Sequence, residues 1–271
     1  MNLRSILLIA ATLASGTGLA LAQAAAPSPL AEAPAETKKL PGWGTPVNPA
    51  EDCKFNVSGE KLHILVPGSK KPHDLGAELG SMDGPRVLQS ISGDFVLQVR
   101  VDGEFQPGDE STEQARTGYT GAGLVVFADE KNYVRIERAT LHSTGDVEHP
   151  YTNFEIRVNG EIQRFGTTGD LPTVDGKPTW LRLERVGNQM LGSMSQDGVH
   201  WNYGQPKDLP EDIWNKGAVQ AGIAAVSTSP MPFEPKYSEF SLKKPTQEDT
   251  ERQQRAADPK DPAASDNVEP K

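Results

Sequence analysis

Three two-residue turns constrain the fold more than any other feature of this sequence. Asn-Gly at 159–160, Gly-Asn at 187–188 and Asp-Gly at 197–198 each separate two segments rich in apolar, β-branched and aromatic residues. Dipeptides of this kind form the tight turns of β-hairpins. Strands joined so closely must pair antiparallel, because a parallel connection needs a crossover of a dozen or more residues. The sequence therefore predicts an antiparallel all-β fold.

The segment 121–138 indicates that the strands form two packed layers. Residues 124–127 are apolar at every position, which is typical of a strand covered on both faces, whereas residues 133–137 alternate between apolar and polar. A buried strand followed by a half-exposed one fits the middle of a two-sheet sandwich. Similar runs predict twelve strands, near 61–66, 86–91, 94–101, 121–128, 132–139, 152–158, 161–165, 179–186, 189–195, 199–203, 218–226 and 236–242. One short helix is expected at 208–216.

Composition divides the chain into four parts. Residues 1–22 have a basic start, an apolar stretch and Ala-Leu-Ala before Gln23, which predicts a secretory signal peptide and a periplasmic or secreted protein with no membrane span after cleavage. Residues 23–40 are rich in Ala and Pro and predict a flexible linker. Residues 41–244 form one uninterrupted block, the predicted sandwich domain. Residues 245–271 predict a disordered acidic tail in which 247–257 form at most a transient helix.

Charge and cysteine content exclude several classes of protein. The formal net charge is −10, which argues against nucleic acid and against an anionic membrane surface as partners. Cys53 is the only cysteine, so no internal disulfide is possible, and we interpret it as a small buried hydrophobic residue. We expect a monomer.

A set of short motifs lies along the predicted sandwich domain. The motifs are Trp43-Gly44-Thr45, Asp52-Cys53-Lys54, KLHILVPG (61–68), His73-Asp74-Leu75, PRVLQ (85–89), GDFVLQVRVDG (93–103), GAGL and NYVRIER within 121–138, WLRLER (180–185) and SQDGVHW (195–201). In these motifs the sequence resembles a bacterial exported family of unknown function, loosely called "regulation of enolase protein"-like. The resemblance covers residues 43–242. It implies a concanavalin A-like jelly-roll sandwich of two antiparallel sheets, related to lectins and glucanases, and supplies no catalytic residues.

The polar sides of three alternating strands suggest a binding surface. In lectin-like sandwiches one sheet face often holds the ligand, and aromatic rings with paired charges suit sugar rings and hydroxyls. The alternative is that Arg and Glu on neighbouring strands merely pair with each other. The binding hypothesis places a shallow glycan-binding groove at Tyr133, Arg135, Glu137, Glu155, Arg157, Trp180, Arg182 and Glu184.

The other candidate chemistries are weaker. Glycoside hydrolases need two carboxylates at a defined separation, and no strand here carries the Glu-x-Asp-x-Glu pattern of sandwich glucanases. No catalytic or metal-ligating residues are assigned, and no cofactor beyond an alternative calcium ion at a rim loop. The candidate oxygen ligands are Asp129, Glu130 and Asn132 in one turn and Asp102, Glu104 and Asp109 in another, and a mixed nitrogen and oxygen set lies at His142, Asp146, Glu148 and His149. His73 and Asp74 are interpreted as part of a turn.

These observations favour a non-enzymatic protein. The first interpretation is a secreted, non-catalytic carbohydrate-binding or interaction module whose partner is a glycan or a cell-envelope protein. The alternatives are a structural envelope protein that acts through protein contacts and, less favoured, a glycoside hydrolase.

Overall fold

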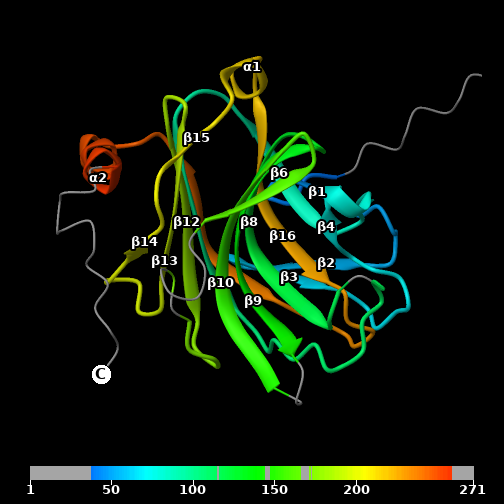
Figure 1. Cartoon of the computed structure of the whole chain (residues 1–271). Coiled ribbons are helices and arrows are strands. Elements are labelled where there is room, and N and C mark those ends of the chain that lie inside the picture. The colour runs from blue at the N-terminus through cyan, green and yellow to red at the C-terminus, as the bar shows by residue number, and fades with distance from the viewer. Residues whose placement is uncertain (1–37, 115, 144–146, 166–170, 172, 258–271) are drawn as a thin grey trace, which may run out of the picture. The chain divides into compact units, whose positions relative to one another are not determined.

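The computed structural model describes residues 38–114, 116–143, 147–165, 171 and 173–257. The predicted signal peptide, residues 23–37 of the predicted linker and residues 258–271 of the predicted tail lie outside this part of the chain. The described residues form an all-β sandwich of two large antiparallel sheets, which confirms the predicted fold class (Figure 1).

One sheet has seven strands and the other has eight. The seven-stranded sheet runs in the order β1 (Thr45–Val47), β6 (Arg86–Ile91), β16 (Val219–Ser227), β8 (Tyr119–Asp129), β9 (Asn132–Ser143), β10 (Val147–Val158) and β11 (Glu161–Phe165). The eight-stranded sheet runs in the order β14 (Asn202–Tyr203), β13 (Gln189–Ser195), β12 (Thr179–Val186), β7 (Phe95–Asp102), β17 (Lys236–Lys243), β3 (Lys61–Leu65) and β2 (Lys54–Ser58), with β15 (Lys207–Asp208) also paired to β13.

The predicted turns join neighbouring strands as expected. Asn159 and Gly160 connect β10 to β11, and both have positive φ, as a two-residue hairpin turn requires. Gly187 connects β12 to β13 with a φ of 58°. The strand predicted at 199–203 is shorter than expected, since only β14 forms there. The predicted helix at 208–216 is the single turn α1 (Glu211–Trp214), and Asp208, the first residue of the predicted range, lies in β15 instead.

Alternation along each strand builds the core between the two sheets. Phe95 and Leu97 of β7, Ile136 of β9, Phe154 of β10 and Leu183 of β12 are each completely buried and belong to one cluster. Each such side chain contributes roughly 1.5–3 kcal/mol of transfer free energy. Their chain neighbours must then point to the outer surface of their own sheet.

Residues 73–84, called the cover segment below, lie on the outer surface of the seven-stranded sheet. The segment contains β4 (Leu75–Gly76), the 3-10 turn η1 (Ala77–Leu79) and β5 (Ser81–Met82). Leu75 is fully buried against Val125, Phe127, Tyr133 and Ala224, which lie on the sheet side facing away from the main core. A second, smaller apolar cluster therefore attaches this segment to the sheet.

The chain differs from its prediction after residue 245. Residues predicted to be disordered form helix α2 (Gln247–Ala257), which packs against β12 (Figure 1). Thr246 and Asp249 form a reciprocal cap, in which the Thr246 amide donates to Asp249 Oδ2 at 2.8 Å and the Asp249 amide donates to Thr246 Oγ1 at 3.2 Å. Arg252 then pairs with Glu184 of β12 at 2.9 Å. No helix among the described residues is long and apolar enough to cross a membrane.

The close approach of β16 and β6 gives a test of the strand order. A Cβ atom at Gly222 would lie 1.9 Å from the carbonyl oxygen of Val87, so Gly222→Ala must push the two strands apart. We expect the free energy of unfolding to fall by roughly 1–3 kcal/mol in urea titrations followed by circular dichroism. Gly217→Ala is the matched control, because no atom lies within 4 Å of its Cβ position. Equal stability of the two variants would contradict this packing.

Candidate functional site

The eight residues predicted to share one groove lie on two different surfaces. Val134, Ile156 and Leu181 point into the core, so the polar neighbours on β9 and β10 face outward from the seven-stranded sheet and those on β12 face outward from the eight-stranded sheet. The first surface holds Tyr133, Arg135, Glu137, Glu155 and Arg157, and the second holds Trp180, Arg182 and Glu184. The prediction of one shared groove is therefore wrong. Alternation fixes which residues avoid the core, but a sandwich has two outer surfaces.

On the seven-stranded sheet the predicted charges form a buried network. Arg135 Nη2 lies 2.8 Å from Glu155 Oε1 and 3.2 Å from Glu137 Oε1. Arg157 contacts Glu155 directly and also reaches Glu78 of the cover segment at 2.8 Å. These β9 and β10 side chains are at most 3% exposed. The pairing that the sequence offered as an alternative to ligand binding is therefore present.

The environment shifts the pKa values of the two glutamates in opposite directions. Burial raises the pKa of Glu155, but the charges of Arg135 and Arg157 and a hydrogen bond from Asn153 outweigh it and lower the pKa to about 2. Burial is also the largest effect on Glu137, where it raises the pKa against the opposing charge of Arg135. Protonation of Glu155 on acidification therefore opposes folding, whereas protonation of Glu137 favours it.

The cover segment removes part of this surface from water. Tyr133 donates a hydrogen bond from its hydroxyl to the carbonyl of Leu75 at 2.6 Å, and burial raises its pKa to about 12. Arg116 holds the segment from the other side, with Nε 3.3 Å from Asp74 Oδ2 and Nη2 2.6 Å from Glu78 Oε1. Tyr133 and the network beneath Glu78 are therefore structural contacts of the cover and not an open groove.

An opening remains beside the cover segment. A pocket of about 290 Å³ is lined by Arg116, Thr117, Tyr119, Arg135, Leu141, Tyr151 and Asn153. The rings of Tyr119 and Tyr151 lie 6.4 Å apart at 48°. The Tyr119 hydroxyl donates to Glu137, and Asn153 donates to Glu155 Oε2 at 2.7 Å. The pocket therefore stands directly on the buried network.

Only Arg135 of the eight predicted residues lines this pocket. Tyr119 and Tyr151 were missed because they come together only through the register, in which Tyr119 pairs with Leu141 and Tyr151 with Ala139 on β9. Asn153 shares its parity with Glu155, so alternation alone places it on this surface. A ligand role for any of these residues stays a prediction.

On the outer surface of the eight-stranded sheet, the three predicted residues contact side chains outside the predicted set. The Trp180 indole donates to Glu239 Oε2 at 2.8 Å, and the Arg100 guanidinium lies 4.9 Å from its ring centroid. Arg182 lies 3.7 Å from the ring centroid of Trp201. Glu184 is fully buried beside Arg252 of α2, and its pKa is raised, chiefly by burial. Helix α2 thus contacts Glu184, one of the three predicted residues on this surface.

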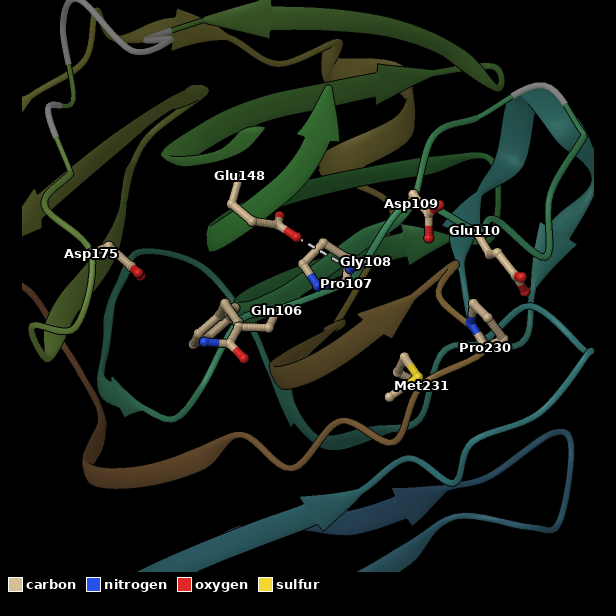
Figure 2. A pocket seen from close by; sticks show the side chains of 10 residues that line it. Gln106, Pro107, Gly108, Asp109, Glu110, Glu148, Asp175, Pro230 and Met231 are labelled. Atoms are coloured by element: carbon tan, nitrogen blue, oxygen red, sulfur yellow. Dashed lines mark hydrogen bonds between the residues drawn. The ribbon is translucent and has the colours of Figure 1, made fainter. Parts of the chain in front are cut away.

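A larger acidic pocket lies where several loops meet. It measures about 570 Å³ and includes Asp109, Glu110, Glu148 and Asp175 in its lining, as Figure 2 shows. Glu148 Oε1 accepts a hydrogen bond from the Gly108 amide at 3.2 Å. The structure brings Asp109 and Glu148, from two different candidate ligand sets, to one pocket. Among the described residues they are not part of a group of three potential ligands that gathers closely enough to hold an ion.

The predicted calcium turns have other roles. Asp129 accepts hydrogen bonds from the Lys131 amide and from Asn132 Nδ2, so Asn132 turns its amide nitrogen, not its oxygen, toward the carboxylate. Asp102 pairs with Arg100 at 3.1 Å. Asp146 lies outside the described residues. Within the described ranges, one group of three His, Cys, Asp or Glu ligand atoms gathers within 4.8 Å, and it consists of Asp52, Cys53 and His73.

Comparisons with known proteins identify the fold and no family. No family model and no curated protein matches the chain, so the resemblance to a named family stays an interpretation. The structure is similar to that of a functionally unknown protein from Saccharomyces cerevisiae, with 20% identity, a TM-score of 0.56, and coverage of 75% of this chain and 97% of that one.

The structure is also similar to the GH43 BlXynB protein from Bacillus licheniformis, with 12% identity and a TM-score of 0.53 over 73% of this chain. A second GH43 glycoside hydrolase matches with 12% identity and a TM-score of 0.51 over 73% of this chain. The match covers 35% of the first GH43 chain and 37% of the second, little more than a third of their length. At these identities the likeness shows the sandwich fold alone.

The buried network predicts that substitution of Glu155 lowers the stability of the fold strongly. In Glu155→Gln, Arg135 and Arg157 lose their shared carboxylate, and we expect the free energy of unfolding at pH 7 to fall by about 3–5 kcal/mol. Because the pKa of Glu155 is lowered, its contribution is complete above the ordinary value of 4.5 and declines toward about pH 2. The difference between wild type and variant should therefore shrink over that range in denaturant titrations.

Asp102→Asn is the matched control for this measurement. Asp102 pairs with Arg100, and both side chains are about one-third exposed, at 35% and 33%. Its loss should cost at most about 1 kcal/mol. If both variants lost a similar free energy of unfolding, the buried network on β9 and β10 would contribute no more to stability than an exposed ion pair.

Proposed function

We propose that this protein is a non-catalytic carbohydrate-binding module whose saccharide site is the pocket beside Tyr119 and Tyr151. The observation that carries the proposal is the pairing of two tyrosine rings with Arg135 and Asn153 in the lining of one pocket. Aromatic rings suit the apolar faces of sugar rings, and a few fixed polar groups orient a ligand in a mainly apolar pocket. Arg135 Nε is buried and has no hydrogen-bond partner among the described residues.

Charge balance favours a neutral saccharide over an acidic one. The pocket and the network beneath it contain three arginines and four carboxylates within a chain of mutual contacts, so no surplus positive charge is available for a ligand carboxylate. The arginines are Arg116, Arg135 and Arg157, and the carboxylates are Asp74, Glu78, Glu137 and Glu155.

The lining also favours binding over hydrolysis. Glycoside hydrolysis uses two carboxyl groups on either side of the bond that breaks. None of the described residues that line this pocket is an aspartate or a glutamate. Glu137 and Glu155 lie beneath it, held by Tyr119, Arg135, Asn153 and Arg157. A binding role therefore fits the pocket better than a catalytic one.

The location and partner follow from the sequence pattern. We infer a periplasmic or secreted protein, because residues 1–22 have the basic, apolar and small-residue order of a secretory signal. A cell-envelope or environmental glycan is the partner that such a location offers. Two of the similar solved structures are GH43 proteins, which is compatible with a carbohydrate ligand although they support the fold alone.

A glycan array with the purified protein tests the proposal. We expect neutral glycans to bind, and Tyr151→Ala to weaken the best ligand at least about tenfold in calorimetric titrations, which corresponds to about 1.4 kcal/mol. Tyr151 is half-buried at the edge of the pocket, so the variant should fold. Trp180→Ala is the control, because Trp180 lies on the outer surface of the other sheet.

Two results would contradict this assignment. Unchanged affinity in Tyr151→Ala, with reduced affinity in Trp180→Ala, would move the site to the eight-stranded sheet. Failure of every glycan on the array to bind would favour the alternative of an envelope protein that acts through protein contacts.

A further inference from the structure

Asp52, Cys53 and His73 bring three different metal-ligating groups together at the start of the cover segment. His73 Nε2 lies 2.9 Å from Asp52 Oδ1, and Cys53 Sγ lies 3.5 Å from the same oxygen. All three ligand atoms lie within 4.8 Å of one another. His73 and Cys53 are buried, at 1% and 7% exposed. The side chains of a histidine, a cysteine and an aspartate thus lie close together, although Cys53 and His73 are 20 positions apart in the chain.

The backbone around these residues is held in place by other contacts. Asn48 donates from Nδ2 to the carbonyl of Cys53 at 2.9 Å and accepts the Cys53 amide at 3.4 Å. His73 exchanges two backbone hydrogen bonds with Ser227 at the end of β16, each at 2.9 Å. The ligands therefore stand on two anchored segments, one leading into β2 and one leading into the cover segment. Such anchoring is what a preorganised site requires.

We propose that Asp52, Cys53 and His73 bind a divalent transition-metal ion, for which Zn²⁺ is the best fit. Zinc takes sulfur, nitrogen and oxygen ligands in tetrahedral sites, and its bond lengths place neighbouring ligand atoms about 3.3–3.6 Å apart. The oxygen–sulfur separation of 3.5 Å already meets this requirement, and the oxygen–nitrogen separation of 2.9 Å must open by a few tenths of an ångström.

The donor set argues against the hard cations. Calcium and magnesium prefer all-oxygen ligands, whereas a thiolate and an imidazole select zinc and its neighbours. The Cys53 thiol must lose its proton to bind the ion. About a third of the Asp52 side chain is exposed, at 32%, which leaves a route for the ion and for a water ligand in the fourth position. The site is separate from the saccharide pocket, so either proposal stands without the other.

Cobalt substitution tests the site in the full chain. After removal of bound metal with a chelator, the protein should bind one Co²⁺ or Zn²⁺ per chain, measured by elemental analysis after gel filtration. Co²⁺ bound to Cys53 should give a thiolate-to-cobalt charge-transfer band in the near ultraviolet. Cys53→Ser should abolish the band, and His73→Gln should weaken Zn²⁺ binding at least about tenfold.

A matched control separates this site from adventitious binding. His200 and Asp197 form an exposed His–Asp pair, with 2.7 Å between Nδ1 and Oδ2, so His200→Gln should leave both the band and the stoichiometry unchanged. The melting temperature of the wild type should rise with Zn²⁺, and that of Asp52→Asn, altered at a partly exposed residue, should rise less. Absence of the charge-transfer band in wild type, or binding lost in His200→Gln and kept in Cys53→Ser, would overturn the proposal.

Discussion

Arg135 contacts two glutamates on the outer surface of the seven-stranded sheet, and the need to pair these buried charges explains the contacts around them. A charge shielded from water is tolerated only when it is paired and hydrogen-bonded. Arg135 meets this requirement through Glu137 and Glu155. Glu155 brings in Arg157, and Arg157 requires Glu78. Each buried charge is thus paired with the next, and the last pair, Arg157 with Glu78, holds the 3-10 turn of the cover segment on the sheet.

The same network explains why the candidate saccharide pocket has a fixed lining. Tyr119 donates to Glu137, and Asn153 lies in hydrogen-bond contact with Glu155, so both side chains are oriented from below before any ligand arrives. Arg116 joins the pocket to the cover segment through Asp74 and Glu78. A lining ordered in this way loses little conformational freedom when a ligand binds, which is the main advantage of preorganisation.

The sequence predicted the strands well and the surfaces poorly, for a physical reason. Alternation along β9, β10 and β12 correctly separates inward from outward residues, because a strand has a period of two. The same pattern does not indicate which sheet a strand joins. Arg157 and Arg182 therefore look equivalent in sequence, although they lie on the outer surfaces of different sheets. The cover segment has strands of only two residues, too short for any periodic signal. Its attachment depends on Leu75 and on charge pairs distant in the chain.

The cover segment connects the two proposed sites without making one depend on the other. His73 stands at its start, hydrogen-bonded through its backbone to Ser227 and through its ring to Asp52. Glu78 stands near its middle, bound to Arg157 and Arg116. An ion at His73 would add a further attachment between the start of the cover segment and the residues that lead into β2. Because Arg116 lines the candidate saccharide pocket and pairs with Asp74, the residue after His73, a bound ion would restrict motion of this part of the lining without contacting the ligand.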